Sequence, residues 1–161
     1  MTLWSQISAI EHPIRLRFSS GTVWPMSNLS RRWIAIGAIL AAIGVGLGAY
    51  GAHGLKDTLV RAGFAGDDLA HRLAIFETAV RYQMFHAIAL VVMGLALQHR
   101  ESPAWRFVPW AFLTGIILFC GPLKLLTFAG DEWKWLGAVV PFGGASMIAG
   151  WIALAVCALK K

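Results

Sequence analysis

Four long runs of apolar residues, separated by three short polar connections, make up most of the chain. They extend over residues 34–52, 74–97, 107–128 and 136–159. As a helix, each run is long enough, at about 1.5 Å per residue, to cross a hydrocarbon core of about 30 Å. None alternates polar and apolar residues as a barrel strand does, and helices satisfy their own backbone groups in lipid. The pattern therefore predicts an all-α, polytopic membrane protein whose four transmembrane helices form a bundle.

The first part of the chain lacks this pattern. Residues 1–30 contain scattered serines and show no helical periodicity, so we expect a disordered N-terminal extension, followed by a transmembrane domain over 31–161. Met26 stands shortly before the basic pair that precedes the first run. A misassigned start, which would leave residues 1–25 outside the mature protein, is the alternative interpretation.

Composition agrees with a membrane location. The chain is 58% hydrophobic and 14% charged, whereas average globular chains carry about 25% charged residues. The net charge of +6 does not indicate nucleic-acid binding, because the basic residues lie mainly at the ends of the runs instead of forming one patch with interleaved aromatics. The lipid bilayer is the expected partner.

The positive charges also predict an orientation, because cytoplasmic loops retain Lys and Arg. With both termini inside, the cytoplasmic side carries Arg15, Arg17, Arg31, Arg32, Arg100, Arg106, Lys160 and Lys161, and the other side Lys56, Arg61, Arg72 and Lys134. We therefore predict a multi-pass protein of the cell (inner) membrane with cytoplasmic N and C termini.

Amphipathic residues cluster at the ends of the runs. Tryptophan rings favour the headgroup region, which predicts anchors at Trp33, Trp105, Trp110, Trp133 and Trp135. Between the first two runs, a short interfacial helix is expected, with one apolar face made of Leu55, Leu59, Val60 and Phe64.

Small residues recur along one face of the first run. Gly37, Gly44, Gly48 and Gly51 are spaced for close helix packing, and Gly144 extends a similar pattern in the fourth run. Packing within the chain is the favoured interpretation, since a four-span chain has internal partners. A homo-oligomer stays open.

The second run begins with polar residues that are costly in lipid. A charged side chain at the bilayer centre costs about 2.5–3.5 kcal/mol on insertion scales, so it should face a partner. Glu77 and Arg81 are spaced for an intrahelical ion pair. Tyr82 and His86 form a second pair four residues apart, and Gln83 lies between them. The helix therefore presents two polar faces.

Other irregular residues fall in the same half of the membrane. His53 ends the first run, while Cys120, Gly121, Pro122 and Lys124 lie late in the third and Pro141, Gly143 and Gly144 early in the fourth. Gly-rich or kinked membrane helices are tolerated where protein or water covers the freed backbone groups. We expect a polar half-cavity here, containing His53, Glu77, Arg81, Tyr82, Gln83 and His86. Lys124, near a span end, is expected to extend toward the headgroups.

The polar residues of this half-cavity do not indicate a particular reaction. His53, His86 and Glu77 lack the spacing of a metal-ligand motif, so no metal, cofactor or catalytic residue is assigned. A proton relay through His86 and Tyr82 is weighed against interhelical hydrogen bonding, which is favoured.

Three segments resemble a known family. They are the stretch from Gly48 to Leu55, the stretch from Thr78 to Ala87, and Pro141 to Gly144 followed by Gly150 and Trp151. In order and spacing they are similar to domain-of-unknown-function family 423, which includes the eukaryotic transmembrane protein 256. The resemblance covers about residues 31–159 and implies a four-helix membrane fold without an established activity. Where the family usually has a Ser-Gly-Ser-Leu-Tyr-like stretch, this chain has Cys120-Gly121-Pro122-Leu123-Lys124, so no role of that serine or tyrosine carries over.

The sequence therefore favours a non-enzymatic binding or accessory component, with its polar site in the non-cytoplasmic half. Its partner would be another membrane protein or a lipid or quinone-like ligand. A small-solute or proton-linked transporter is the first alternative, but it needs polar residues in the cytoplasmic half as well. A membrane-embedded enzyme is the second, and it needs a nucleophile or metal beside Glu77 and His53. Neither feature is evident from the sequence.

Overall fold

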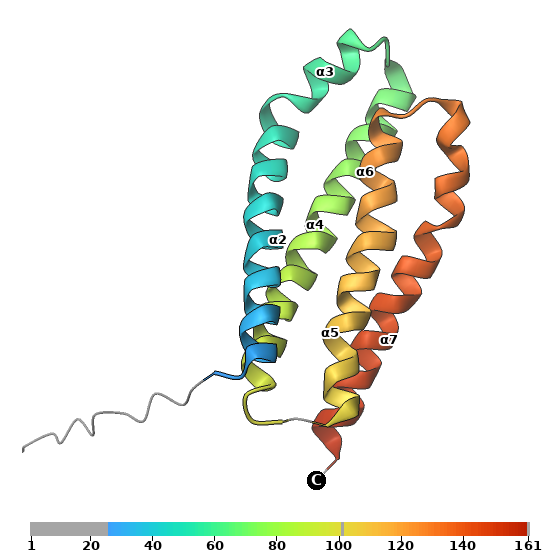
Figure 1. The fold of residues 1–161 in the computed structure, drawn as a ribbon. Helices are drawn as coiled ribbons and strands as arrows, with labels where there is room; N and C mark the ends of the chain where they lie inside the picture. Colours follow the sequence, from blue (N-terminus) through green and yellow to red (C-terminus); the bar gives the residue numbers. More distant parts are fainter. Residues whose placement is uncertain (1–25, 101, 161) are drawn as a thin grey trace, which may run out of the picture.

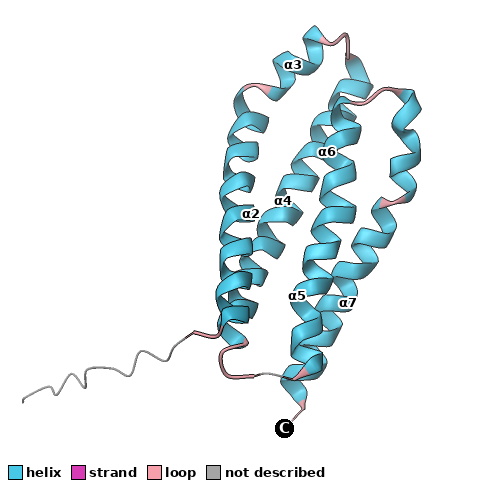
Figure 2. Ribbon diagram, in the orientation of Figure 1, coloured by secondary structure: helices cyan, strands magenta, loops and turns pink. Residues whose placement is uncertain are grey.

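The computed structural model describes residues 26–100 and 102–160, which are helical except for short connections (Figures 1 and 2). The elements are α2 (Asn28–His53), α3 (Leu55–Arg61), α4 (Gly66–Ala96), α5 (Pro103–Gly115), a π-helical turn (Ile116–Cys120), α6 (Gly121–Phe128), a 3-10 helix (Asp131–Ala138) and α7 (Val140–Leu159). Four segments are long and apolar enough to cross a membrane: Asn28–His53, Gly66–Ala96, Pro103–Phe128 and Asp131–Leu159. The predicted all-α architecture with four transmembrane helices is confirmed.

The first span begins slightly earlier than expected. The predicted extension over 1–30 lies mostly outside the described residues. Its last three residues nevertheless belong to α2, because the Ser27 side chain accepts a hydrogen bond from the Ser30 backbone N–H at 3.1 Å. Serine at this position satisfies a backbone donor that the first helical turn leaves free, and this cap fixes the start of the helix at Asn28.

Two helix pairs make up the bundle. α2 packs along α4, α5 packs along α7, and α4 also contacts α5 and α6. Figure 1 shows that α2 begins and α7 ends at the same end of the bundle, while α3 and the connection between α6 and α7 lie at the other. This arrangement makes α4 the helix that joins the two pairs, and its polar residues therefore meet different neighbours on different faces.

Glycine permits the closest contact in the α2–α4 pair. A Cβ atom at Gly37 would lie 2.7 Å from the carbonyl oxygen of Ala87, and one at Gly51 would lie 3.1 Å from the ring of Phe76. At Gly44 an added Cβ would overlap Met84, whereas Gly48 has only an ordinary contact with α4 and Gly144 an ordinary contact with Phe119. The small-residue face of α2 therefore lies against α4 within the same chain.

The larger core lies mainly in the half of the bundle nearer the start of α2. Its buried members include Trp33, Leu90, Met93, Leu97, Val108 and Phe112. Trp33 is only 2% exposed and packs edge-to-face on Trp110 with ring centroids 5.0 Å apart. The prediction that Trp33 anchors the headgroup region was wrong, because the helix packing turns its ring into the protein. Trp110, Trp133 and Trp135 are exposed.

A second cluster closes the opposite end of the α2–α4 pair. Leu55 and Leu59 of α3 are buried with Phe76 and Val80 of α4. The short helix expected after the first span is present, but its apolar face is covered by protein. Val60, assigned to that face, is exposed instead.

The third span has an irregular backbone at the predicted place. The Gly121 backbone N–H donates to the carbonyl oxygen of Ile116 five residues earlier, which is the π-helical pattern. Pro122 lacks a backbone N–H, and in a regular helix its ring would press on the carbonyl of Leu118, so a wider turn relieves this contact. Gly143 of α7 fits directly against the backbone of this turn, where any Cβ atom would overlap Phe119.

Candidate functional site

The structure distributes the predicted polar residues over three faces of α4. Glu77 and Arg81 are exposed on one face, Tyr82 and His86 lie on another, and Gln83 is buried on a third. Successive residues of a helix are rotated by about 100°, so the five predicted residues of α4 do not all share one pocket, although Arg81, Tyr82 and His86 line a common cavity. The polar side chains on the three faces therefore differ in burial and in their neighbours.

His86 is held by hydrogen bonds at both ring nitrogens. Its Nδ1 lies 2.8 Å from the carbonyl oxygen of Tyr82, and Trp151 of α7 donates from Nε1 to His86 Nε2 at 3.1 Å. An indole N–H can only donate, so Nε2 is the acceptor and the proton of the neutral ring is assigned to Nδ1. His86 consequently joins α4 to α7, and neither of its nitrogens is free to accept a proton from a substrate.

Aromatic rings surround this histidine. Its ring centroid lies 5.3 Å from that of Phe112 and 5.9 Å from that of Trp151, and the Tyr82 ring stacks on it at 6.2 Å. Tyr82 also contacts Phe119 in the π-helical turn, at 5.1 Å. The face therefore forms an aromatic cluster that packs α4 against α5 and α7.

Gln83 connects three helices through a single amide. Only 1% of the residue is exposed, and its Nε2 donates to the carbonyl oxygen of Leu40 in α2 at 2.8 Å. Its Oε1 accepts a hydrogen bond from Lys124 Nζ of α6. The expected extension of Lys124 toward the headgroups was wrong, because the side chain turns inward to the amide.

Glu77 and Arg81 form the predicted ion pair between Oε1 and Nη2. Their side chains are 69% and 57% exposed, and in a spanning segment this exposure is toward lipid or headgroups. The pair lies beside a cavity of about 800 Å³ between α2 and α4. The lining residues are mainly small or apolar and comprise Gly48, Gly51, Ala52, Leu55, Lys56, Ala70, Leu73, Ala74, Phe76, Glu77, Val80 and Arg81.

His53 does not join this group. It is exposed at the end of α2, and it is absent from the lining of the α2–α4 cavity. It is also absent from the cavity of about 710 Å³ beside His86, which Arg81, Tyr82, Phe85, His86 and Trp151 line.

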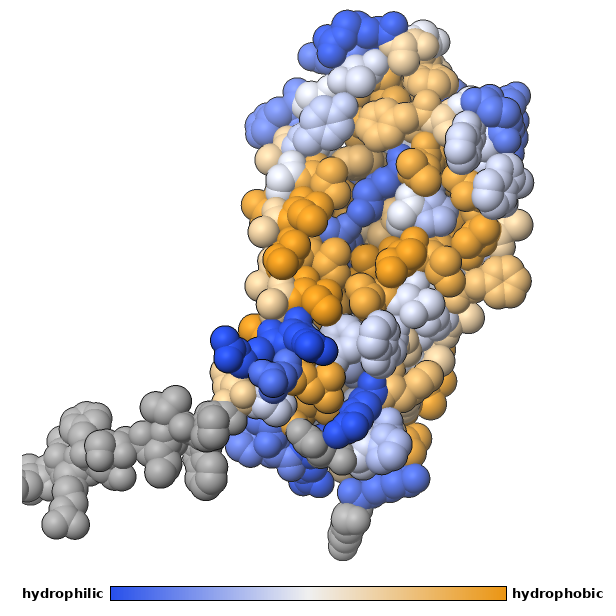
Figure 3. Space-filling model, in the orientation of Figure 1, coloured by the Kyte–Doolittle hydropathy of each residue, from blue (hydrophilic) through white to orange (hydrophobic). Residues whose placement is uncertain are grey.

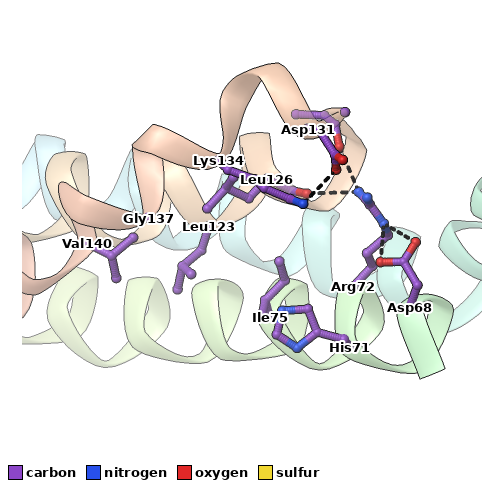
Figure 4. A pocket seen from close by; sticks show the side chains of 12 residues that line it. Asp68, His71, Arg72, Ile75, Leu123, Leu126, Asp131, Lys134, Gly137 and Val140 are labelled. Carbon is purple, nitrogen blue, oxygen red and sulfur yellow. Dashed lines mark hydrogen bonds and ion pairs between the residues drawn. The ribbon is translucent and has the colours of Figure 1, made fainter.

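Arg72 is a central polar residue that the sequence interpretation treated only as a loop charge. Its Nε lies 3.1 Å from both carboxylate oxygens of Asp68. Its Nη1 donates to the carbonyl oxygens of Leu126 and Thr127 at 3.1 Å and of Ala129 at 2.9 Å. Figure 4 shows this side chain extending from α4 toward the end of α6, with Asp68 one turn away. The only sequence signal was the i, i+4 spacing of Asp68 and Arg72.

A cavity of about 370 Å³ lies next to this contact, between α4, α6, the 3-10 helix and α7. Ile75, Leu123 and Val140 give it apolar walls, and the ion pair of Lys134 with Asp131 lies at its edge (Figure 4). The charged groups at this edge are already paired with one another, which leaves no net charge to select a ligand.

The comparisons with known proteins place the chain in a family. Residues 47–144 match the family described as a protein of unknown function, DUF423. The chain belongs to the DUF423 family. It is similar to the UPF0382 membrane protein YwdK of Bacillus subtilis (strain 168), with 36% identity over 129 residues, 80% of this chain and 96% of that protein. A UPF0382 membrane protein of Staphylococcus aureus (strain bovine RF122 / ET3-1) is 36% identical over 128 residues, 80% of this chain and 95% of its own length. No solved structure matches.

Membership in DUF423 establishes a multi-pass membrane protein, because the relatives are named membrane proteins and the chain has four apolar spans. The matched region contains the residues that line the α2–α4 cavity, the Arg72 contact and His86 itself, whereas Trp151 lies beyond it. Within the described part of this DUF423 chain, no three His, Cys, Asp or Glu residues come together as metal ligands.

Proposed function

We propose that this chain is a non-enzymatic binding component of the cell membrane, and that the α2–α4 cavity receives an anionic phospholipid. The supporting observation is the cavity itself, a space of about 800 Å³ with small apolar walls and a charged edge. Its size falls in the range of about 300–1,000 Å³ that is common for small-molecule sites. Lys56 and Arg81 outnumber Glu77 at its edge, so the net charge favours an anionic headgroup.

A binding role is also supported by the state of the other polar groups. Gln83 uses both amide atoms in hydrogen bonds between helices, and His86 uses one ring nitrogen between helices and the other within α4. The half of the bundle near the start of α2 contains the apolar core with Leu90, Met93 and Val108. A transport path would need water or polar groups through this region, so the arrangement supports binding over transport.

The orientation is part of the proposal. The basic residues near the start of α2, in the connection after α4 and at the end of α7 support cytoplasmic termini. The α2–α4 cavity lies toward the other end of α2, near Gly51 and Ala52. In this orientation it opens in the non-cytoplasmic half of the cell membrane, with Lys56 at the end of the bundle that carries α3.

Native mass spectrometry of the purified protein tests the lipid proposal, with dioleoyl phosphatidylglycerol and dioleoyl phosphatidylcholine offered in equal amounts. The wild type should retain several-fold more phosphatidylglycerol. Lys56→Gln should remove this preference, whereas Arg61→Gln should keep it, because Arg61 is an exposed residue of the same short helix that does not line the cavity.

A second variant tests whether lipid binding needs the volume of the cavity. Ala74→Trp should reduce retention of both lipids, because Ala74 lines the cavity. Equal retention of the two lipids by the wild type, or an unchanged preference in Lys56→Gln, would refute the proposal.

A further inference from the structure

Lys124 is a basic residue that has no carboxylate partner in the described part of the chain. Its ammonium group has three N–H donors, and its hydrogen bond goes to the neutral amide of Gln83. The ion pairs of the described residues join Arg72 to Asp68, Arg81 to Glu77 and Lys134 to Asp131. None of them includes Lys124.

The ammonium lies close to the level of the middle of α2. Gln83, its partner, donates to the carbonyl oxygen of Leu40. Leu40 is about 18–20 Å from either end of α2, at about 1.5 Å per residue. An amide and an ammonium at this depth are far from the headgroups, so lipid phosphates at the membrane surface do not reach them.

The group is also accessible from the side of the bundle. Lys124 is half-buried, and its neighbour Leu125 is 56% exposed. Figure 3 shows a hydrophilic stripe on an otherwise hydrophobic face between α2 and the span formed by α5 and α6. The hydrogen bonds of Gln83 with Leu40 and Lys124 join these two sides of the face.

We propose that this face docks a transmembrane helix of another protein, and that an Asp or Glu near the middle of that helix pairs with Lys124. A carboxylate supplies the opposite charge and accepts the two remaining N–H bonds, which a neutral amide cannot do alone. A segment that brings a carboxylate to this depth must satisfy its own backbone in lipid, so it is helical. The proposal concerns a different face from the α2–α4 cavity and does not depend on lipid binding there.

Photo-crosslinking in the native membrane tests this interface. A photoreactive amino acid at position 125, next to Lys124, should give one protein adduct, and mass spectrometry should place the crosslink in a transmembrane helix with Asp or Glu near mid-span. Lys124→Met should reduce the adduct at least ten-fold, and Lys124→Arg should retain it. Lys134→Met is the matched control, because it removes a lysine at an exposed end of the bundle.

A charge exchange makes the test specific. Lys124→Asp alone and the partner's acid→Lys change alone should each abolish the adduct, and the two together should restore it. Size-exclusion profiles in detergent show whether each variant remains folded. The proposal is overturned if the adducts contain only lipid, only a second copy of this chain or a helix without a mid-span acid, or if Lys124→Met leaves the adduct unchanged in a folded protein.

Discussion

Arg72 Nη1 lies 2.9 Å from the carbonyl oxygen of Ala129, across 57 residues of sequence. The same nitrogen donates to the carbonyl oxygens of Leu126 and Thr127. The last carbonyls of a helix have no partners within that helix, and a cation near them also interacts favourably with the helix dipole. Arg72 therefore caps the C-terminal end of α6, and the Asp68 carboxylate holds its guanidinium in place.

We predict that this contact is a major source of stability. The Arg72 side chain is 11% exposed and Asp68 is 54% exposed, so Arg72→Met should lower the free energy of unfolding by about 2–4 kcal/mol, chiefly because the α6 carbonyls lose their donor. Arg72→Lys should lose about 1–3 kcal/mol, since one ammonium cannot reproduce the planar fork. Denaturant unfolding in detergent measures both, with the exposed Arg61→Lys as the control. Equal stability of Arg72→Met and the wild type would contradict the prediction.

A second prediction concerns the α2–α4 contact. Gly37→Ala should destabilise the protein by about 1–3 kcal/mol, because the new methyl group would press on the backbone of Ala87 and Val91. Gly46→Ala provides the matched control in the same helix, since beyond the local helix backbone no atom lies within 4 Å of its Cβ position. The control should be neutral or slightly stabilising, because alanine favours helix. If both variants unfold alike, α2 does not pack on α4 through Gly37.

A third prediction separates hydrogen bonding from packing at His86. Trp151→Phe should cost about 1–3 kcal/mol, because it leaves His86 Nε2 without its donor. The double variant Trp151→Phe with His86→Phe should be more stable than the single one, since it removes the buried polar group as well. Unfolding in detergent measures the series, and Trp135→Phe at an exposed ring is the control. A double variant that is less stable than Trp151→Phe would give His86 a further polar role.

The fourth prediction concerns the exposed pair of Glu77 and Arg81. Glu77→Ala or Arg81→Ala alone should reduce the folded yield more than the double change does, because each leaves one charge facing lipid without a partner. Folded yield by size exclusion after extraction completes this double-mutant cycle. Strictly additive losses would mean that the two charges act independently.

The fifth prediction tests the orientation. Cysteine substituted for Asp67, which is exposed in the first turn of α4, should react with a membrane-impermeant maleimide in intact cells. Cysteine substituted for Arg100, in the connection after α4, should react only after permeabilisation. The reverse pattern would place the termini outside.

The spans could be predicted from the sequence because hydrocarbon imposes a simple requirement. A segment of about 20 apolar residues that satisfies its own backbone has few alternatives to a transmembrane helix. The irregular backbone of the third span could also be predicted, since Gly121 and Pro122 interrupt regular helical hydrogen bonding. The pair of Glu77 and Arg81 followed from spacing within one helix. These features depend only on local geometry.

Local geometry could not show which residues of the predicted polar site come together in space. His53, Glu77 and His86 fall in the same half of the membrane, but this position does not give the direction of a side chain around its helix. That direction depends on which helices pack against α4, and the structure has α2 on one side and α5 and α6 on another, with α7 contacting His86 through Trp151. Arg72 was missed for the same reason, because its acceptors lie 54 to 57 residues away.

The sequence by itself determined the membrane environment and the number of spans, because these follow from hydrophobicity and the rise of a helix. The tertiary structure decided which polar groups meet. It turned Lys124 inward to Gln83, paired His86 with Trp151 and placed Arg72 at the end of α6. The physical reason is that a buried hydrogen-bonding group must find a partner in space, and that partner is chosen by helix packing across the bundle.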